Sequence, residues 1–244
     1  MTKILALDSS SDACSVALNC DGVVTGLFEM AAKSHTQRIL PMVDEVLRQA
    51  GCDKRELDAI AFGRGPGSFT GLRICLGVVQ GLAFGLQVPV VPVSTLAAMA
   101  AGYYQRLNER PSHHEKAREH PVLVALDARM SEVYWGLFLH EPHSLLPKPL
   151  APEFVMPPAG VIEYAIATQY RGQMIGLGPG WHYEDLAQLA PAALDLQVYP
   201  DAADMARMAE ELLQRGEVVS AMEAQPVYLR DEVSWQKRQR IRSE

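Results

Sequence analysis

Two similar stretches decide the fold of this chain: ILALDSSSDACSVAL at 4–18 and VLVALDARMSEVYWGLFL at 122–139. Each has an apolar segment that ends at an aspartate, then a short polar turn and a second apolar segment. That order is typical of a buried strand, a turn and another strand. Asp8 and Asp127 hold equivalent places in the two stretches. This internal similarity predicts a duplicated unit, and therefore an α/β fold with two related lobes.

The first half contains further strand and helix patterns. A helix that begins with a capping box of Ser34 and Gln37 is expected to end at Gly51. A second helix is expected at about 70–85. It is apolar almost all round, so we expect it to be covered on every side. The strands expected in this half lie at 4–8, 14–19, 23–29 and 59–63.

Glycines recur every fourth residue in the second of these helices, at Gly77, Gly81 and Gly85. Residues at this spacing share one face of a helix, so the three form a flat ridge that another backbone can approach closely. Each glycine costs about 1 kcal/mol against alanine, which calls for a compensating contact. A contact within the chain and a contact with another molecule fit the pattern equally well.

The boundary between the two lobes is predicted in the charged, proline-containing segment NERPSHHEKAREH at 108–120, which is typical of an exposed connection. The second lobe continues with a strand at 174–177 and helices near Glu184 and at 204–215. The predicted division is a first lobe at 1–107, a second lobe at 108–230 and a basic tail at 231–244.

Charge and cysteine content narrow the class of protein. With 22 basic and 29 acidic residues the net charge is −7, which argues against a chain-wide electrostatic contact with nucleic acid. For the tail we favour a solvated chain end over a contact with RNA phosphates. No C-x-x-C pair occurs and the first residues do not resemble a signal peptide. We therefore expect reduced cysteines and a cytoplasmic protein.

An uncharged segment between Arg73 and Arg106 has the length of a membrane span. Its glycines, followed by Pro89 and Pro92, divide it into a helix, a short buried strand and the start of another helix. The interpretation is therefore a soluble core, with no membrane partner.

The loop GPGSFTGLR at 65–73 is the strongest local signal for a ligand. Its glycines permit close backbone approach, and the amino terminus of the following helix could hold an anion. Its spacing is neither that of a P-loop nor that of a dinucleotide turn. We favour a shaped turn, and we also favour a structural role for the aspartate after the first strand. The candidate nucleotide contacts are Asp8, Gly65, Gly67, Ser68, Thr70 and Arg73.

Histidines give no convincing metal site. His113, His114 and His120 lie in the polar connection, which is typical of a solvated loop. His140 and His143 lack the i, i+4 spacing of a helical zinc pair and have a proline between them. No nucleophile with an assignable base occurs either, so the sequence predicts no metal of its own and no self-contained catalysis.

Six segments, taken together and in this order, closely resemble the bacterial TsaB (YeaZ) family: DSSSDACSVAL, HTQRILPMVDEVL, GRGPGSFTGLRICLGVVQGLA, VSTLAAMA, LDARMSEVYW and PVYLR. The resemblance covers nearly the whole chain. It implies a fold of the actin, Hsp70 and sugar-kinase (ASKHA) type, with two α/β lobes and a cleft between them.

The resemblance also implies a non-catalytic role. Members of this family act with the related enzyme TsaD and the ATPase TsaE. Together these transfer threonylcarbamoyl from threonylcarbamoyl-AMP to N6 of adenosine 37 in ANN-reading tRNAs, with TsaB as scaffold and activator. The catalytic paralogue carries an H-x-x-x-H metal pair on the helix that here reads LAAMAAG at 96–102, where no histidine stands. No cofactor is expected on this chain; ATP or ADP and metal are expected on the partners, and contact with tRNA is expected through the complex.

The partner surface is likewise implied by the resemblance. It places the TsaD contact on the helices at 35–50 and 70–85, and the same surface would form a homodimer when TsaD is absent. The residues expected to contact the partner are His35, Ile39, Leu40, Val43, Leu47, Leu76, Gly77, Gln80, Gly81 and Phe84.

Two rival functions remain open from the sequence. A small-molecule kinase of the same fold would use Asp8 to orient magnesium phosphates and Asp127 to activate a hydroxyl. A peptidase would need a nucleophile or a metal, and the sequence offers neither in a usable pattern.

Overall fold

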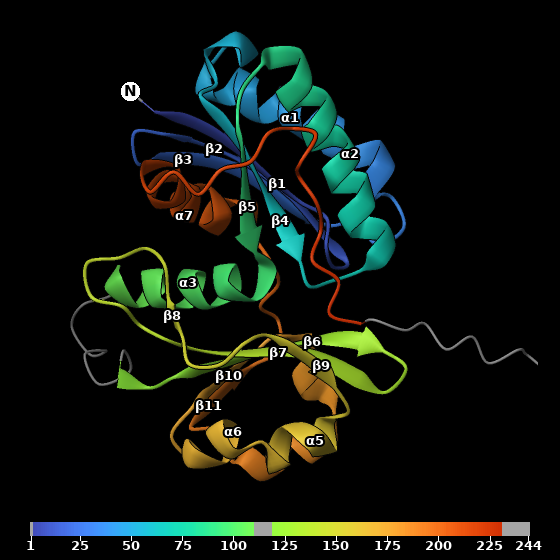
Figure 1. Ribbon diagram of the computed structural model, residues 1–244, viewed down its shortest axis with the longest axis vertical. Helices are drawn as coiled ribbons and strands as arrows, with labels where there is room; N and C mark the ends of the chain where they lie inside the picture. The colour runs from blue at the N-terminus through green and yellow to red at the C-terminus, as the bar shows by residue number, and fades with distance from the viewer. Residues whose placement is uncertain (1, 110–118, 231–244) are drawn as a thin grey trace, which may run out of the picture.

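A computed structural model describes residues 2–109 and 119–230 of the chain. Two β-sheets lie one above the other, with helices outside and between them (Figure 1). The basic tail at 231–244, together with His113 and His114 of the connection, lies outside the described residues.

The first sheet has the strand order β3-β2-β1-β4-β5. Its first three strands, all predicted from the sequence, form an antiparallel meander, and the other two run parallel to β1. Strand β1 is buried on both faces because helices cover each side of the sheet. Its odd-numbered residues Leu5 and Leu7 belong to one core, and its even-numbered residues Ile4 and Ala6 belong to the other. The bounds are β1 Lys3–Asp8, β2 Ala13–Cys20, β3 Val23–Met30, β4 Ala59–Gly65 and β5 Val90–Ser94.

The second sheet repeats this arrangement in the order β8-β7-β6-β10-β11. As in the first sheet, three strands form an antiparallel meander, here β6, β7 and β8. The other two strands, β10 and β11, run parallel to β6. The predicted duplication is therefore confirmed at the level of sheet topology. The bounds are β6 Val122–Arg129, β7 Glu132–Leu139, β8 Lys148–Pro149, β10 Ile175–Leu177 and β11 Ala193–Asp195, with β9 Phe154–Met156 paired to β7.

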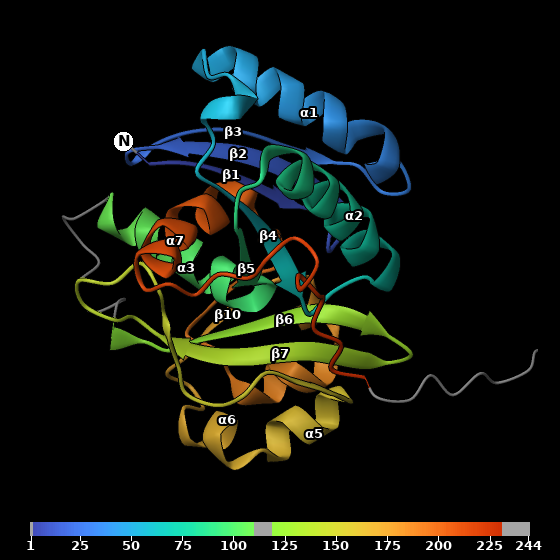
Figure 2. The same cartoon turned by 45° about the horizontal axis from the view of Figure 1, so that its top comes forward.

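Helices complete a layered structure. Figure 2 shows α1 and α2 above the first sheet, α7 and α3 between the sheets, and α5 and α6 below the second sheet. The predicted helix near Glu184 is a 3-10 helix, Glu184–Leu189. Further 3-10 turns span Lys54–Glu56 and Pro179–His182. The helix bounds are α1 His35–Ala50, α2 Phe69–Leu86, α3 Thr95–Asn108, α5 Pro158–Glu163, α6 Ala165–Gln169 and α7 Ala202–Gln214.

The predicted assignment of residues 108–230 to the second lobe is wrong at its end, because α7 packs on the first sheet. Met205, Ala206 and Ala209 are fully buried against small side chains such as Ala6 and Ala61. Burial of the apolar face stabilises α7 on this sheet, although the strands that it contacts lie far away in the sequence. The chain thus leaves the first lobe after α3, builds the second, and returns.

Helix α3 joins the two lobes. Leu96, Met99 and Tyr104 pack in the core of the second sheet, whereas Ala98 belongs to the core beneath the first sheet. Gly102 lies where α7 comes closest, since a Cβ there would stand 1.9 Å from a carboxylate oxygen of Asp204. The helix is therefore shared by both lobes.

The predicted capping box of Ser34 and Gln37 is wrong. The Ser34 backbone is not extended, and its hydroxyl donates to the Ala31 carbonyl at 3.0 Å instead of capping α1. Pro41 is accommodated inside the helix, which continues through it. A serine three residues before a glutamine therefore does not form a capping box when its hydroxyl is bonded to a carbonyl of the preceding turn.

A true capping box occurs at the short 3-10 helix that follows α1. The Asp53 carboxylate accepts a hydrogen bond from the Arg55 amide at 2.9 Å, and Glu56 accepts one from the Asp53 amide at 3.1 Å. Replacing Asp53 with alanine is expected to lower the free energy of unfolding by about 1 kcal/mol. Urea unfolding measures this difference. Asp44→Ala, which changes an exposed carboxylate inside α1, is the control; an equal effect of both variants would contradict the capping role.

Candidate functional site: a docking face on α1 and α2

Helix α2 buries one side only. Leu72, Cys75, Val79 and Ala83 pack against the first sheet, and Ser68 caps the helix by accepting from the Gly71 amide at 3.3 Å. One helix of the structure, α2, is long and apolar enough to cross a membrane by length and composition. Its packing against the sheet is that of a helix at the edge of a core, and a single such helix is weak grounds for a membrane span.

The glycine ridge of α2 points away from the molecule. A Cβ added to Gly77, Gly81 or Gly85 would meet no atom within 4 Å. The prediction that α2 is covered on every side is therefore wrong for the part of the chain that the structure describes. Of the two contacts that fitted the ridge, the one within the chain is not found among the described residues.

Apolar side chains beside the ridge are exposed to an unusual degree. Phe84 of α2 is 72% exposed and Met222, on the segment after α7, is 81% exposed. With Gln80, Gly81 and Ala221 they line an open hollow of about 430 Å³. Exposed apolar surface joined to a concave site is characteristic of a protein interface. We refer to the outward side of α2 and this hollow as the docking face.

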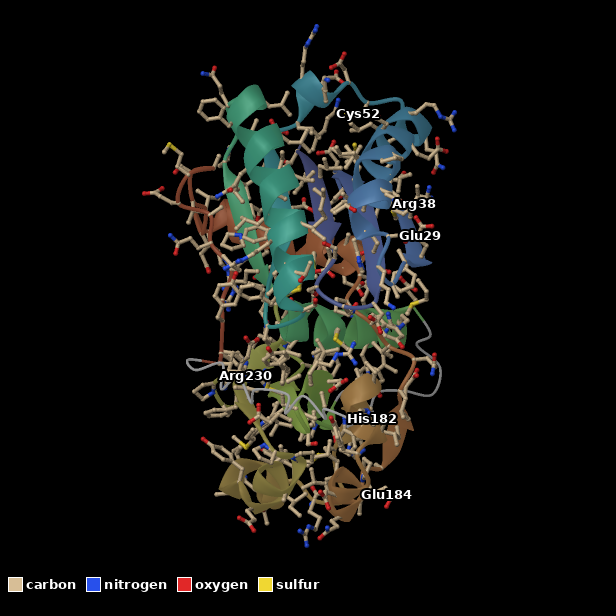
Figure 3. The ribbon with its side chains drawn as sticks, turned by 90° about the vertical axis from the view of Figure 1, so that its right-hand side faces the viewer. Glu29, Arg38, Cys52, His182, Glu184 and Arg230 are labelled. Carbon is tan, nitrogen blue, oxygen red and sulfur yellow. The ribbon has the colours of Figure 1, made fainter. Side chains whose placement is uncertain are left out.

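Helix α1 lies beside α2, and fewer of its side chains are exposed on the predicted partner surface than expected. Figure 3 views the molecule from the side on which the two helices lie next to each other. Ile39, Val43 and Leu47 are core residues, so these three side chains form no part of an exposed surface. Leu40, in contrast, is 48% exposed. His35 is half-buried, and its Nε2 atom is buried without a hydrogen-bond partner among the described residues.

The remaining predicted contacts divide between the surface and the boundary of the core. Leu76 and Gln80 are half-buried, and Gln80 donates to the Ala224 carbonyl at 3.1 Å. The outer side of α1 is charged, with an ion pair between Glu29 of β3 and Arg38 at 2.8 Å that Figure 3 labels. The apolar part of the docking face is therefore α2 rather than both helices equally.

Asp8 lies at the carboxyl end of β1 as predicted, but it is buried. Its Oδ1 accepts from the Ser10 amide at 3.0 Å and from the Ser10 hydroxyl at 2.9 Å. Its Oδ2 is buried without a partner among the described residues, and a Cβ at Gly63 would stand 2.0 Å from it. Burial raises the pKa of the Asp8 carboxyl to about 7.

The GPGSFTGLR loop is shaped by the turn that follows β1. The Ser68 amide donates to the Ser10 carbonyl at 2.7 Å, and the Ser9 hydroxyl donates to the Gly71 carbonyl at 2.8 Å. A Cβ at Gly71 would stand 1.9 Å from the Ser9 carbonyl oxygen, and one at Gly67 would stand 2.4 Å from that of Ser10. These glycines are needed for backbone approach. The turn after β1 therefore lies directly against the start of α2.

The other candidate nucleotide contacts do not converge. Gly65 is buried with φ +105° and lies against the Val227 carbonyl, whereas Ser68 and Thr70 are exposed. Arg73 is exposed too, and its guanidinium stacks 3.7 Å from the Phe69 ring centre. Local sequence does not reveal the partner that completes this cluster, Tyr228, which is 155 residues away and accepts from Arg73 Nε at 3.0 Å.

Asp127 is held within the second lobe. Its Oδ1 accepts from the Arg129 amide at 2.8 Å and from the Tyr183 hydroxyl at 3.2 Å. Its Oδ2 forms an ion pair with Arg129 at 3.1 Å. In the nearby segment GLGPG at 176–180, Gly178 permits close packing, because a Cβ there would stand 2.5 Å from the Ala125 carbonyl oxygen.

Residues 96–102 of α3, the segment where the resemblance implied that a metal-binding histidine pair is missing, lie mostly in the core. Leu96, Ala98, Met99 and Gly102 of α3 are buried. Across residues 2–109 and 119–230, no group of three His, Cys, Asp or Glu side chains is placed to hold a metal ion. The four cysteines are free thiols, with Cys14 and Cys75 buried and Cys20 and Cys52 half-buried.

Comparison with known proteins links this geometry to one family. Residues 20–165 match the family described as TsaD: tRNA N6-adenosine threonylcarbamoyltransferase. The chain is 40% identical over 238 residues to the tRNA threonylcarbamoyladenosine biosynthesis protein TsaB of Escherichia coli, covering 96% of this chain and 97% of that protein. It is 39% identical to the Haemophilus influenzae protein of the same name, covering 96% of both.

A solved structure agrees. YeaZ from Pseudomonas aeruginosa superposes with a TM-score of 0.81 at 43% identity, covering 94% of this chain and 100% of that one. Sheet topology and sequence together define a two-lobed α/β protein related to the threonylcarbamoyltransferases. Within that class, the chain belongs to the TsaB (YeaZ) family.

Proposed function

We propose that this chain is a non-catalytic scaffold and activator of a TsaD transferase in the formation of threonylcarbamoyladenosine in tRNA. In this proposal TsaD, with TsaE, transfers the threonylcarbamoyl group from threonylcarbamoyl-AMP to N6 of adenosine 37 of ANN-reading tRNAs. The names of the relatives support the pathway, since both are called tRNA threonylcarbamoyladenosine biosynthesis proteins. The match to the TsaD family supports a related enzyme as the partner.

The observation that carries the proposal is the outward side of α2. A helix interior with three glycines and exposed apolar residues is costly in a free chain, because glycine destabilises helices and apolar surface prefers burial. A partner helix packed on the ridge would offset both costs. A TsaD subunit is the proposed occupant, and a second copy of this chain would take its place when TsaD is absent.

The non-catalytic role is supported by the residues around the two strand-end aspartates. Asp8 is buried beneath the β1 turn and Asp127 is bonded to Arg129 and Tyr183. A magnesium nucleotide would need these carboxylates to be accessible and ionised. We therefore assign ATP or ADP and any metal to the partner proteins and contact with tRNA to the assembled complex.

We further infer that the two lobes form an actin, Hsp70 and sugar-kinase type of fold and that the protein is cytoplasmic. The matching strand order of the two sheets supports the fold. The proposed substrate supports the cytoplasmic location, because tRNA is found in the cytoplasm.

The test of the proposed function is a reconstituted transfer reaction. TsaD, TsaE, ATP, threonine-derived threonylcarbamoyl-AMP and tRNA are combined with and without this chain, and modified adenosine is measured after digestion of the tRNA. Transfer is expected only when the chain is present with TsaD, and none from the chain alone. Equal transfer without the chain would contradict the proposal.

A further inference from the structure

The segment after α7, residues 217–230, connects the docking face to the second lobe; we call it the strap. In Figure 1 it is the orange-red ribbon that leaves α7, crosses the first sheet beside α2 and ends at the second lobe. It contains no helix or strand. Its position is nevertheless fixed by contacts along its whole length.

The first part of the strap is anchored in the first lobe. Val219 forms a two-way backbone bridge with Val90 of the edge strand β5, with both hydrogen bonds at 2.9 Å. Ala224 is 1% exposed and belongs to the core beneath α1 and α2. Further on, the Val227 amide donates to the Arg64 carbonyl at 2.7 Å. The strap therefore moves with the first sheet and not as a free chain end.

The strap also forms part of the docking face. Its turn supplies Met222, which lines the hollow together with Phe84. Two levels of α2 are bonded to it: Gln80 donates to the carbonyl of Ala224, and Arg73 donates to the hydroxyl of Tyr228. A molecule seated on the docking face would therefore touch α2 and the strap together.

The end of the strap is fixed to the hairpin of β6 and β7. The Arg230 guanidinium donates to the Ala128 carbonyl at 3.2 Å and to the Glu132 carboxylate. These two acceptors stand on either side of the hairpin turn. Side-chain exposure in the pair is 20% for Arg230 and 28% for Glu132, so solvent screens it less than a surface ion pair.

The turn held by Arg230 is strained. Three consecutive residues, Arg129, Met130 and Ser131, have φ of 62°, 57° and 59°. Each non-glycine residue in this left-handed region costs about 1–2 kcal/mol, and such runs persist only where the surroundings hold them. Met130 at the tip is 60% exposed, so its own packing contributes little to holding the turn. The bonds from Arg230 reach both sides of the turn, in addition to the strand pairing of Arg129 with Glu132 and the bonds from Arg129 to Asp127.

We infer that the strap couples the docking face to the β6–β7 hairpin: a partner bound against Met222 and Phe84 restrains the strap further and, through Arg230, slows the opening of the strained turn of the second lobe. This rests on the proposed function for the identity of the partner, TsaD. Coupling of two sites through a shared element is reciprocal, and factors of 5–150 are typical. The predicted signal is slower opening of the turn in the complex.

Hydrogen exchange of the full-length chain, free and bound to TsaD, tests the coupling. Peptides that cover the turn are expected to exchange about fivefold or more slowly in the wild-type complex. In Arg230→Met the complex still forms, because Arg230 lies outside the docking face, but the turn gains no protection. Glu132→Ala cuts the same link from the other lobe and should give the same result. Arg215→Met removes an ion pair with Glu211 on α7 and is the matched control.

Three results are distinguishable. Protection of the turn in the wild type and in Arg215→Met, lost in Arg230→Met and Glu132→Ala, supports the coupling. A wild-type complex whose turn is not protected, or protection that persists in both link variants, overturns it. If size-exclusion chromatography shows no wild-type complex with TsaD at all, the proposed function is wrong and the inference fails with it.

Discussion

Replacing Gly81 with leucine is expected to weaken binding to TsaD about a hundredfold while leaving the isolated chain as stable as before or more so. A leucine side chain on the ridge would hold a partner backbone away from α2. Loss of close packing at the centre of an interface costs about 2–4 kcal/mol, and each 1.4 kcal/mol is a factor of ten in the dissociation constant.

The free chain has room for this side chain. A Cβ at Gly81 meets no atom within 4 Å, and exchanging a glycine for leucine inside a helix gains up to about 1 kcal/mol. The stability of the isolated chain should therefore rise while its affinity for TsaD falls. This combination distinguishes a lost interface from a misfolded protein.

Isothermal titration with TsaD and thermal unfolding of the isolated chain measure the two effects. Gln49→Leu is the control, because it adds the same side chain at an exposed position on the charged side of α1. It should leave the affinity within about twofold. An unchanged affinity of Gly81→Leu would show that the ridge is not part of the interface.

Replacing Asp8 with asparagine is expected to remove a large pH dependence of stability. Burial raises the pKa of this carboxyl from its ordinary value of 3.8 to about 7. Between these two values the folded state holds a proton that the unfolded state releases, so the contribution of Asp8 to stability is fully present below pH 3.8 and is lost as the pH rises to about 7. At about 1.4 kcal/mol per pKa unit, the loss reaches up to about 4 kcal/mol.

Asparagine has the same shape and cannot ionise, so it keeps the acceptor for Ser10 and lacks the falling slope. Urea unfolding of both proteins between pH 4.5 and 8 measures the difference. Asp204, whose pKa burial raises to about 6, contributes equally to both and cancels. Asp44→Asn, at an exposed site, controls for charge. Parallel curves for wild type and Asp8→Asn would mean that Asp8 is ionised in the fold.

Much of each sheet could be predicted from the sequence. The two strand–turn–strand units carry their pattern in contiguous residues, and the register within them follows from adjacent segments. The matching strand orders confirm the duplication that Asp8 and Asp127 indicate. The spacing of the glycines likewise identified the side of α2 that forms the docking face.

What escaped prediction depends on residues far apart in the chain. The packing of α7 on the first sheet and the course of the strap beside α2 depend on contacts between distant residues, such as Arg73 with Tyr228, which local patterns do not contain. The burial of Ile39, Val43 and Leu47 follows from the orientation of α1 on the sheet. The wrong capping box at Ser34 shows the same limit at short range, because Ala31 competes for the hydroxyl.

The return of the chain to its first lobe also sets the order in which the protein can be completed during synthesis. Strands β1 to β5 emerge first, yet one face of their sheet stays uncovered until α7 has been made. The second lobe, from 119 to 198, packs on α3, which is made before it, and it can therefore fold as soon as it leaves the ribosome. The lobe that begins the chain is therefore the last to finish, and its docking face forms only when the final described residues arrive.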